Sequence, residues 1–337
     1  MQVSPKLGNY VVNLGNAQLE KSIAEVWYRQ TLDAYATFTV VLAADAPTMR
    51  RWKTSDCPAE ASLTWAAKKI FAGHILKAEI WGVSRIHLTY VDGLYLASKE
   101  SGNSFMKQQT LRDALQKLAA GCGLQPQFRG TFAELLTGFQ HGSSSSLEVI
   151  QMLADKHGFH FTSRSGSSHL LFIKSGEGFG SASVDVASDG AQVSFRQSAE
   201  TSYDTIQFRY FDSKTAQPAD TKLMKGQLYQ PLSGFTAASS FQEKTKWKTA
   251  CGKIETYMTD RHHFDGGQRL LAEQLSKRAM AQEALQVVCF EPLALPGDKL
   301  SATNCPSTSQ DGAYLVSGCE ITINSALPRL TLTAMRA

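Results

Sequence analysis

The stretch of sequence that most constrains the fold is residues 105–173, because it is patterned for helices while both of its flanks are patterned for strands. Two stripes of apolar residues recur there at helical spacing: Leu111, Leu115, Leu118 and Ala119, and then Leu147, Ile150, Leu153 and Ala154. Thr110 precedes the first stripe as a helix N-cap, and Gly158 follows the second as a helix end. Short extended runs follow each stripe, and the last two form a hairpin around Gly166. This order predicts a small α+β unit of helix, strand, helix and hairpin.

Strand patterns occupy the chain on either side of this unit. Ile86, Leu88 and Tyr90 alternate with polar residues, so that one face of the expected strand is apolar. The same alternation returns farther along the chain, for example at Val184 and Val186. Glycines separate these short runs, which is typical of a β-sandwich or a barrel. The predicted fold class is therefore α+β and rich in β-strands.

Residues 215–285 interrupt the second β region. Residues 215–252 are polar and irregular, whereas residues 268–285 are rich in Ala, Leu, Glu, Lys and Arg. These residue types favour a helix. The pattern predicts an insert that ends in the one long helix of the chain, after which strands resume at residue 286.

Length and composition bound the class of protein. A chain of 337 residues predicts two or three domains, and its net charge of +4 is too small to indicate nucleic-acid binding by itself. The first residues contain no apolar signal segment, and no run reaches the ~20 apolar residues of a membrane span. We therefore expect a soluble protein, made in the cytoplasm and without membrane insertion of its own. The six cysteines form no CxxC motif, which indicates reduced thiols rather than a disulfide framework or a zinc site.

The densest cluster of metal-ligating residue types is His262, His263 and Asp265. One interpretation is a metal or catalytic site. The other is a polar loop before the expected long helix, where Asp265 lies near the positive end of the helix dipole. We favour the loop, because no HExxH-type spacing supports a metal site.

Three lysines alternate along a short extended segment: Lys244, Lys246 and Lys248. A period of two places them on one side of a strand, where they could line a channel crossed by nucleic acid or by an anionic partner. The alternative is a solvated edge strand, which proteins protect with lysines against edge-to-edge pairing. Because only three charges are involved, we favour the edge strand.

Carboxylates of the central unit leave open a glycosidase pair. Glu134, Glu148 and Asp155 are the candidates, and a working pair would have to lie ~5 to 9 Å apart. Each of them fits a helix surface better than a catalytic role. The sequence therefore predicts that the chain is not an enzyme, with no catalytic residue and no cofactor.

Several motifs occur in an order that resembles one family. They are residues 88–96 (LTYVDGLYL), 110–119 (TLRDALQKLA), 203–212 (YDTIQFRYFD), 295–298 (LPGD), 311–316 (DGAYLV) and 331–334 (TLTA). In this order they resemble the baseplate-hub family of contractile phage tails, also called late control protein D. That family is similar to the N-terminal hub region of the type VI secretion spike protein VgrG. The likeness covers most of the chain, except residues 216–259.

The resemblance implies two similar antiparallel β-barrel domains with small α+β inserts, assembled as a ring-shaped homotrimer. It places the first barrel at residues 1–102, the α+β unit at 103–175, the second barrel at 176–214 plus 286–337, and the insert at 215–285. Three subunits would present six near-equivalent barrels, which adapts a sixfold tail tube to a threefold central spike.

The implied partners are other tail proteins. A tail tube or distal tail protein would lie above the hub and a central spike protein below it, beside the tape-measure protein and other baseplate subunits, with DNA passing through the lumen. The implied location is the baseplate of a virion or of a phage-derived bacteriocin particle, assembled in the bacterial host cytoplasm.

The chain ends at Ala337, without the long β-prism that follows the hub region in type VI spike proteins. This difference favours a phage tail or a bacteriocin particle over the hub portion of a type VI spike. The rival from the enzyme class is a tail-associated peptidoglycan hydrolase that uses Glu134 or Glu148. A carbohydrate-binding tail-fibre adhesin is the third reading, although the long repeats typical of fibres are missing.

Overall fold

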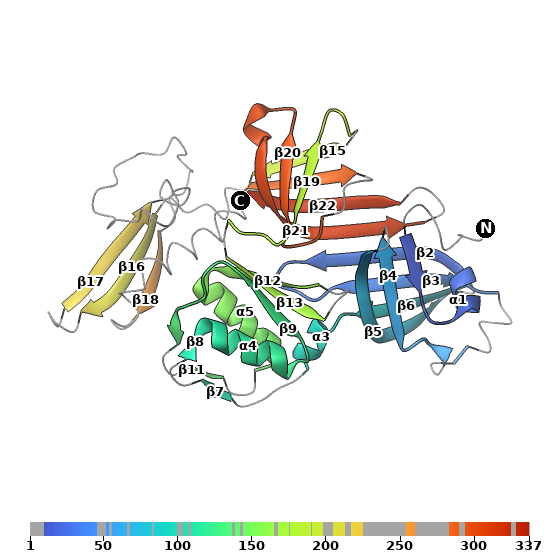
Figure 1. The fold of residues 1–337 in the computed structure, drawn as a ribbon, viewed down its shortest axis with the longest axis horizontal. Coiled ribbons are helices and arrows are strands. Elements are labelled where there is room, and N and C mark those ends of the chain that lie inside the picture. Colours follow the sequence, from blue (N-terminus) through green and yellow to red (C-terminus); the bar gives the residue numbers. More distant parts are fainter. Residues whose placement is uncertain are drawn as a thin grey trace.

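The computed structural model describes residues 10–45, 52–53, 56–65, 68–82, 84–99, 104–106, 109–136, 139–141, 144–164, 168–174, 176–189, 191–197, 205–212, 217–224, 254–259, 283–289, 294–324 and 328–336. Strands dominate this part of the chain, and the helices are few and short (Figure 1). The fold is a β-rich α+β fold, as expected. No described helix is long and apolar enough to cross a membrane.

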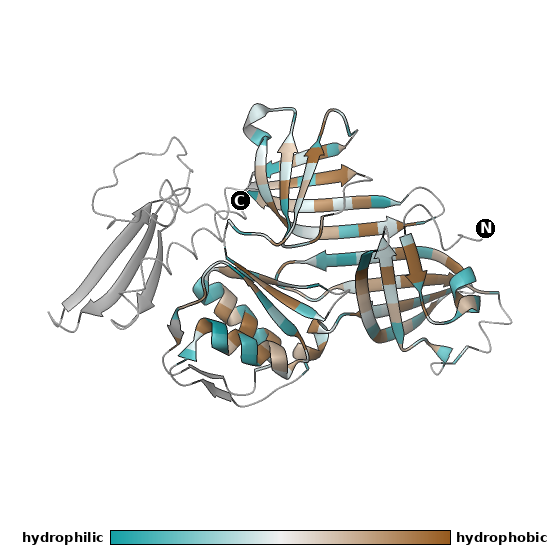
Figure 2. Ribbon diagram, in the orientation of Figure 1, coloured by the Kyte–Doolittle hydropathy of each residue, from teal (hydrophilic) through white to brown (hydrophobic). Residues whose placement is uncertain are grey.

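The N-terminal region forms a first group of six strands. Its elements are β1 (Tyr10–Asn13), α1 (Ala17–Lys21), β2 (Ile23–Thr31), β3 (Thr37–Ala43), β4 (Glu60–Trp65), β5 (Lys68–Trp81) and β6 (Arg85–Val91). The strands pair in the order β1-β4-β5-β6-β3-β2, and every neighbouring pair is antiparallel. Alternating apolar residues give each strand one face toward the core (Figure 2). The ring of Phe71 lies 5.1 Å from that of Phe38 and 6.0 Å from that of Tyr28, and all three side chains are fully buried.

The C-terminal region forms a second group of six strands. Its elements are β14 (Ser181–Asp185), β15 (Gln192–Gln197), β19 (Glu283–Cys289), β20 (Lys299–Thr303), η6 (Thr308–Gln310), β21 (Gly312–Ile323) and β22 (Arg329–Arg336). They pair in the order β14-β20-β21-β22-β19-β15. Counted along the chain, both groups have the strand order first, fourth, fifth, sixth, third, second. They differ in one pair, since β14 runs parallel to β20 whereas β1 runs antiparallel to β4.

The two groups join into one twelve-stranded sheet through β2 and β21. This junction corrects the expectation of two closed barrels, because neither group closes on itself within the described residues. In the first group the reason is that β3 occupies one edge of β2 and β21 occupies the other, so β1 has no edge of β2 to bind. One apolar core runs through both groups.

The α+β unit connects the two groups in sequence. It comprises α3 (Leu94–Ala97), β7 (Ser104–Met106), β8 (Gln109–Thr110), α4 (Leu111–Gly121), β9 (Gln125–Arg129), β10 (Leu135–Leu136), β11 (Phe139–His141), α5 (Ser146–His157), β12 (Phe159–Arg164) and β13 (His169–Lys174). A sheet of order β12-β13-β9 packs against α4 and α5 over a separate apolar core (Figure 1). Thr110 caps α4 by accepting from the amide of Asp113, and Gly158 ends α5 in the left-handed conformation.

Three further strands lie between β15 and β19, the first of them before the expected insert at residues 215–285. They are β16 (Thr205–Asp212), β17 (Gln217–Met224) and β18 (Ile254–Thr259), paired in the order β17-β16-β18. The helix expected over residues 268–285 is wrong at its end, because residues 283–285 belong to β19. Leu285 and Val287 point into the core of the second group, and this packing outweighs the helix propensity of the local sequence. Residues 260–282 lie outside the described residues, and the domain boundaries stay a prediction.

Candidate assembly surface

Large apolar side chains are exposed on one part of the first strand group. Ile80 is 54% exposed and Trp81 59% exposed, and Leu76 lies on the same strand, β5. Trp27 of β2 is also exposed. Exposed apolar side chains that gather in one place mark surfaces for protein contact more often than scattered ones do.

Trp27, Trp81 and His87 form a connected aromatic patch, here called the tryptophan patch. The ring of Trp81 on β5 stacks on the imidazole of His87 on β6, with 4.6 Å between the ring centres. The ring of Trp27 on β2 lies 5.8 Å from the same imidazole. Burial lowers the pKa of His87, and the neighbouring guanidinium of Arg85 lowers it further. His87 is therefore neutral at neutral pH, and the patch is apolar and uncharged at its centre.

The end of β5 and the outer edge of β15 carry no partner strand in the described part of the chain. Residues 76–81 of β5 pair with β6 on one side only, because β4 covers the other side only up to His74. β15 likewise pairs with β19 on one side only. Free edges present unpaired backbone donors and acceptors, which is the usual basis for strand addition by another chain.

The edge of β12, in contrast, is covered by polar contacts from the first strand group. Asp33, in the turn after β2, has a positive φ of 61° and accepts from the amide of Phe161 at 2.9 Å. Its carboxylate also lies 2.7 Å from Nδ1 of His160, and its own amide donates to the Phe161 carbonyl at 2.7 Å. Gln30 of β2 donates to Oγ1 of Thr162 at 2.9 Å. These contacts fix the α+β unit against β2.

Asp92 makes a second contact between the same two parts. This fully buried carboxylate follows β6 and accepts from the amides of Ala36 at 3.0 Å and Leu94 at 3.2 Å, and from the hydroxyl of Ser163. Burial raises its pKa to about 6, although these donors oppose the rise. Its three donors come from both parts, so Asp92 anchors the α+β unit to the first strand group, and among the described residues it belongs to no cluster that could hold a metal ion.

The second strand group holds the α+β unit through Arg164 and Asp298. The two side chains form an ion pair, and Asp298 also accepts from the amide of Leu295 within its turn. Gly297 of that turn has a φ of 90°, and a Cβ there would lie 2.6 Å from Cδ1 of Ile173. The α+β unit is therefore fixed to both strand groups in a defined orientation.

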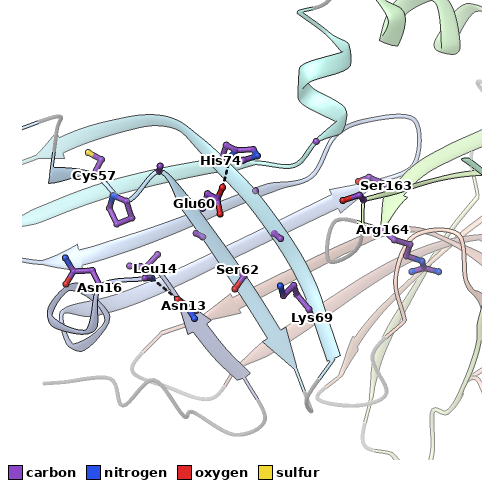
Figure 3. Close-up of a pocket in the computed structure, with 18 of the residues that line it drawn as sticks. Asn13, Leu14, Asn16, Cys57, Glu60, Ser62, Lys69, His74, Ser163 and Arg164 are labelled. Atoms are coloured by element: carbon purple, nitrogen blue, oxygen red, sulfur yellow. Dashed lines mark hydrogen bonds and ion pairs between the residues drawn. The ribbon is translucent and has the colours of Figure 1, made fainter. Parts of the chain in front are cut away.

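A polar cleft of about 880 Å³ lies between β1, β4 and β5 on one side and the tip of the β12–β13 hairpin on the other (Figure 3). Asn13, Ser62 and Lys69 line the first side, and Ser163 and Arg164 lie across from them (Figure 3). The cleft contains one loose ion pair, between His74 and Glu60 at 3.7 Å. Burial raises the pKa of its thiol, Cys57, which is the opposite of what an activated nucleophile needs. The arrangement suits solvent or a docked loop better than catalysis.

The carboxylates considered for hydrolysis have structural partners. Glu134 accepts from Nζ of Lys174 at 2.9 Å, and the same ammonium donates to the carbonyl of His157 at 2.8 Å. Burial alone would raise the pKa of Glu134, but the Lys174 ammonium holds it below its ordinary value. Glu148 forms a capping box with Ser145 at the start of α5, and Asp155 lies exposed on α5. Nothing in this geometry pairs two of them for glycoside hydrolysis.

The other residues singled out in the sequence lie outside the described residues. These are the metal candidates His262, His263 and Asp265, and the basic strand of Lys244, Lys246 and Lys248. The structure brings none of them to a described site, and both assignments stay predictions. The sequence patterns did not single out Ile80, Trp81 or the edge of β15, which the structure exposes.

No family model and no curated protein matches the amino-acid sequence. Solved structures match the fold over almost its whole length. The 43 kDa tail protein of prophage MuSo2 from Shewanella oneidensis has a TM-score of 0.65 at 11% identity, with 94% of each chain covered. A tail protein from Neisseria meningitidis MC58 has a TM-score of 0.67 at 11% identity, with 94% of this chain and 93% of that one covered.

A third similar structure comes from a secretion system. The E. coli c3393 protein, a component of the type VI secretion system with structural similarity to the T4 bacteriophage tail proteins gp27 and gp5, has a TM-score of 0.57 at 10% identity. The match covers 94% of this chain and 74% of that one. The chain therefore shares the fold of phage tail proteins and of a type VI secretion component.

Proposed function

We propose that the chain is the structural hub of a phage tail or of a tail-like particle, and that it works as a homotrimer. The observation that carries the proposal is the repeated strand order of the two six-stranded groups. A chain with two similar units presents six of them when three copies form a ring, so that one face matches a sixfold tube and the other a threefold spike. The shared fold with tail proteins supports the same role.

The proposed work of the protein is done by its surfaces. The tail tube or distal tail protein binds on one face of the ring, the central spike on the other, and the tape-measure protein and other baseplate subunits lie beside them. The described residues offer exposed strand edges and the tryptophan patch for such contacts, whereas their buried carboxylates are occupied by structural partners. The hub is located in the tail baseplate after assembly in the host cytoplasm.

Light scattering on the purified full-length protein tests this proposal. A homotrimer has three times the 36.8 kDa mass of the chain, and electron microscopy of the same sample should show rings with a central channel. A protein that stays monomeric at micromolar concentration contradicts the proposal. Peptidoglycan digestion by the purified trimer would instead favour the enzyme reading.

A further inference from the structure

The two strand groups correspond residue by residue, and the β-bulges fix the alignment. β5 and β21 each carry one bulge against the next strand, at residues 75–77 and 316–318. The cross-strand partners then carry the correspondence outward. One ladder runs through Ala78, Leu88, Val40 and Val26, and the other through Cys319, Leu332, Val287 and Val193. β2 is therefore equivalent to β15, and the end of β5 to the end of β21.

The aligned strands share residues that pattern reading alone did not reveal. Residues 26–30 read VWYRQ and residues 193–197 read VSFRQ, while Glu79 and Ile80 correspond to Glu320 and Ile321. One member of each equivalent pair of strands already has a partner. β2, the equivalent of β15, pairs with β21, whose end is equivalent to the end of β5. At this β2–β21 junction, Arg29 lies opposite Glu320, with 3.1 Å between Nε of the arginine and Oε1 of the glutamate. Tyr28 lies opposite Ile321.

The equivalent edges of β15 and of the end of β5 carry no partner strand in the described part of the chain, as is also true of the outer edges of β1 and β14. Ile321 is 1% exposed beneath β2, whereas its equivalent Ile80 is 54% exposed. Tyr28 is fully buried beside β21, whereas its equivalent Phe195 is only half-buried. The same residue types are thus buried at the β2–β21 junction and more exposed at the unpaired edges of β15 and β5.

We infer that β15 of one copy pairs with residues 78–82 of a second copy, the end of β5 and the residue after it, in the register of the β2–β21 junction. This register places Arg196 opposite Glu79 of the partner copy and Phe195 opposite Ile80 of the partner copy. The inference rests on the proposed function, because it says which strands join the subunits of the ring. Each copy offers one β15 edge and one β5 edge, so the contact is head-to-tail and three such contacts close a trimer.

The side chains at the proposed junction are complementary. Within the chain, Trp27 of β2 lies opposite Thr322 of β21. At the proposed junction Ser194 would lie opposite Trp81, so that an indole again meets a small hydroxyl side chain with the strands exchanged. Among the described residues, Glu79 forms an exposed ion pair with Lys77 at 3.0 Å, and such pairs are weak. The carboxylate is therefore available to Arg196.

Engineered disulfides test the register. In Glu79→Cys/Arg196→Cys, opposed Cα atoms of paired strands fall within disulfide range, so mild oxidation should give covalent dimers and trimers on a denaturing gel without reductant. Mass spectrometry should find the peptide pair that contains positions 79 and 196. The matched control is Arg29→Cys/Glu320→Cys, which should cross-link within one chain and leave its size unchanged. The single variants report any cross-linking through the six natural cysteines.

Charge reversal gives an independent readout. Arg196→Glu and Glu79→Arg should each move trimer dissociation to about tenfold higher protein concentration, since like charges opposite one another weaken paired strands. The double reversal should restore the wild-type value. A wild-type protein that is trimeric while Glu79→Cys/Arg196→Cys gives no intermolecular disulfide overturns the inference and leaves the proposed function standing. A monomeric wild type overturns the proposed function itself.

Discussion

Ile80 and Ile321 occupy equivalent positions in two strands of the same sheet, yet one is 54% exposed and the other 1% exposed. The difference comes from β2, which lies against β21 and leaves the end of β5 open. The same side chain at equivalent positions is therefore buried in one strand and exposed in the other. A substitution at Ile321 should change the stability of the fold, whereas a substitution at Ile80 should change mainly the association of subunits.

Truncation at these two positions should affect different equilibria. Ile321→Ala leaves a cavity in the core and should lower the free energy of unfolding by about 2–5 kcal/mol at any protein concentration. Ile80→Ala should cost less than about 1 kcal/mol in the dissociated chain, because its side chain is already half in water. Its main effect should be a weaker trimer. Urea unfolding at concentrations below and above the association midpoint checks this, and equal losses for both variants in the dissociated chain would contradict it.

Asp92 should make stability depend on pH. Its pKa is raised from 3.8 to about 6 by burial, so the folded state holds this proton more tightly than the unfolded chain does. The stabilisation from the protonated form is complete below about pH 4 and is lost as the pH rises through about 6. The loss is at most about 3 kcal/mol.

Asp92→Asn isolates this effect. Its amide group faces the donors of Ala36 and Ser163, so the variant should be less stable than the wild type throughout. The difference in the free energy of unfolding between wild type and Asp92→Asn should be largest near pH 4 and shrink toward pH 7. Urea titrations at several pH values measure it, and a difference that grows with pH would show that Asp92 is not the titrating group.

The buried pair of Lys174 and Glu134 should be sensitive to the loss of one partner. Lys174→Met leaves the Glu134 carboxylate without its cation and should cost about 3–5 kcal/mol. Lys174→Met/Glu134→Leu removes both charges and should recover much of that loss. Because the pKa of Glu134 is lowered in the folded state, the contribution of the pair is present at neutral pH and is lost as the pH falls through that lowered value. Chemical unfolding of the two single variants and the double variant gives the coupling energy.

Local signals predicted the α+β unit well because its helices are bounded by short-range contacts. The Thr110 cap and the turn at Gly158 depend on residues within four positions along the chain. The twelve-stranded sheet could not be read in the same way. Its central junction joins residues such as Arg29 and Glu320, which are far apart in sequence, and no local pattern says which edge β2 uses.

The same limit explains the errors and omissions. Helix propensity extended the predicted helix to residue 285, but the alternation of Leu285 and Val287 belongs to a strand buried between β15 and β22. The repeat of VWYRQ as VSFRQ was the signal that could have revealed two equivalent strand groups. The meaning of this repeat for assembly comes from the pairing of Arg29 with Glu320 in the chain and from the proposed pairing of Arg196 with Glu79 of a second copy.

The packing of β5 against the end of β6 should tolerate no side chain at Gly73. A Cβ at this position would lie 2.2 Å from the carbonyl oxygen of Val91 and 2.5 Å from the ring of Phe71, so backbone and core would both have to move. We expect Gly73→Ala to lower the free energy of unfolding by about 3 kcal/mol or more. The matched control is Gly121→Ala at the end of α4, where a Cβ meets nothing within 4 Å and alanine favours the helix by up to about 1 kcal/mol. Thermal and urea unfolding of both variants measure the contrast. If Gly73→Ala is as stable as Gly121→Ala, the backbone at Gly73 does not lie as close to the Val91 carbonyl and the Phe71 ring as the structure places it.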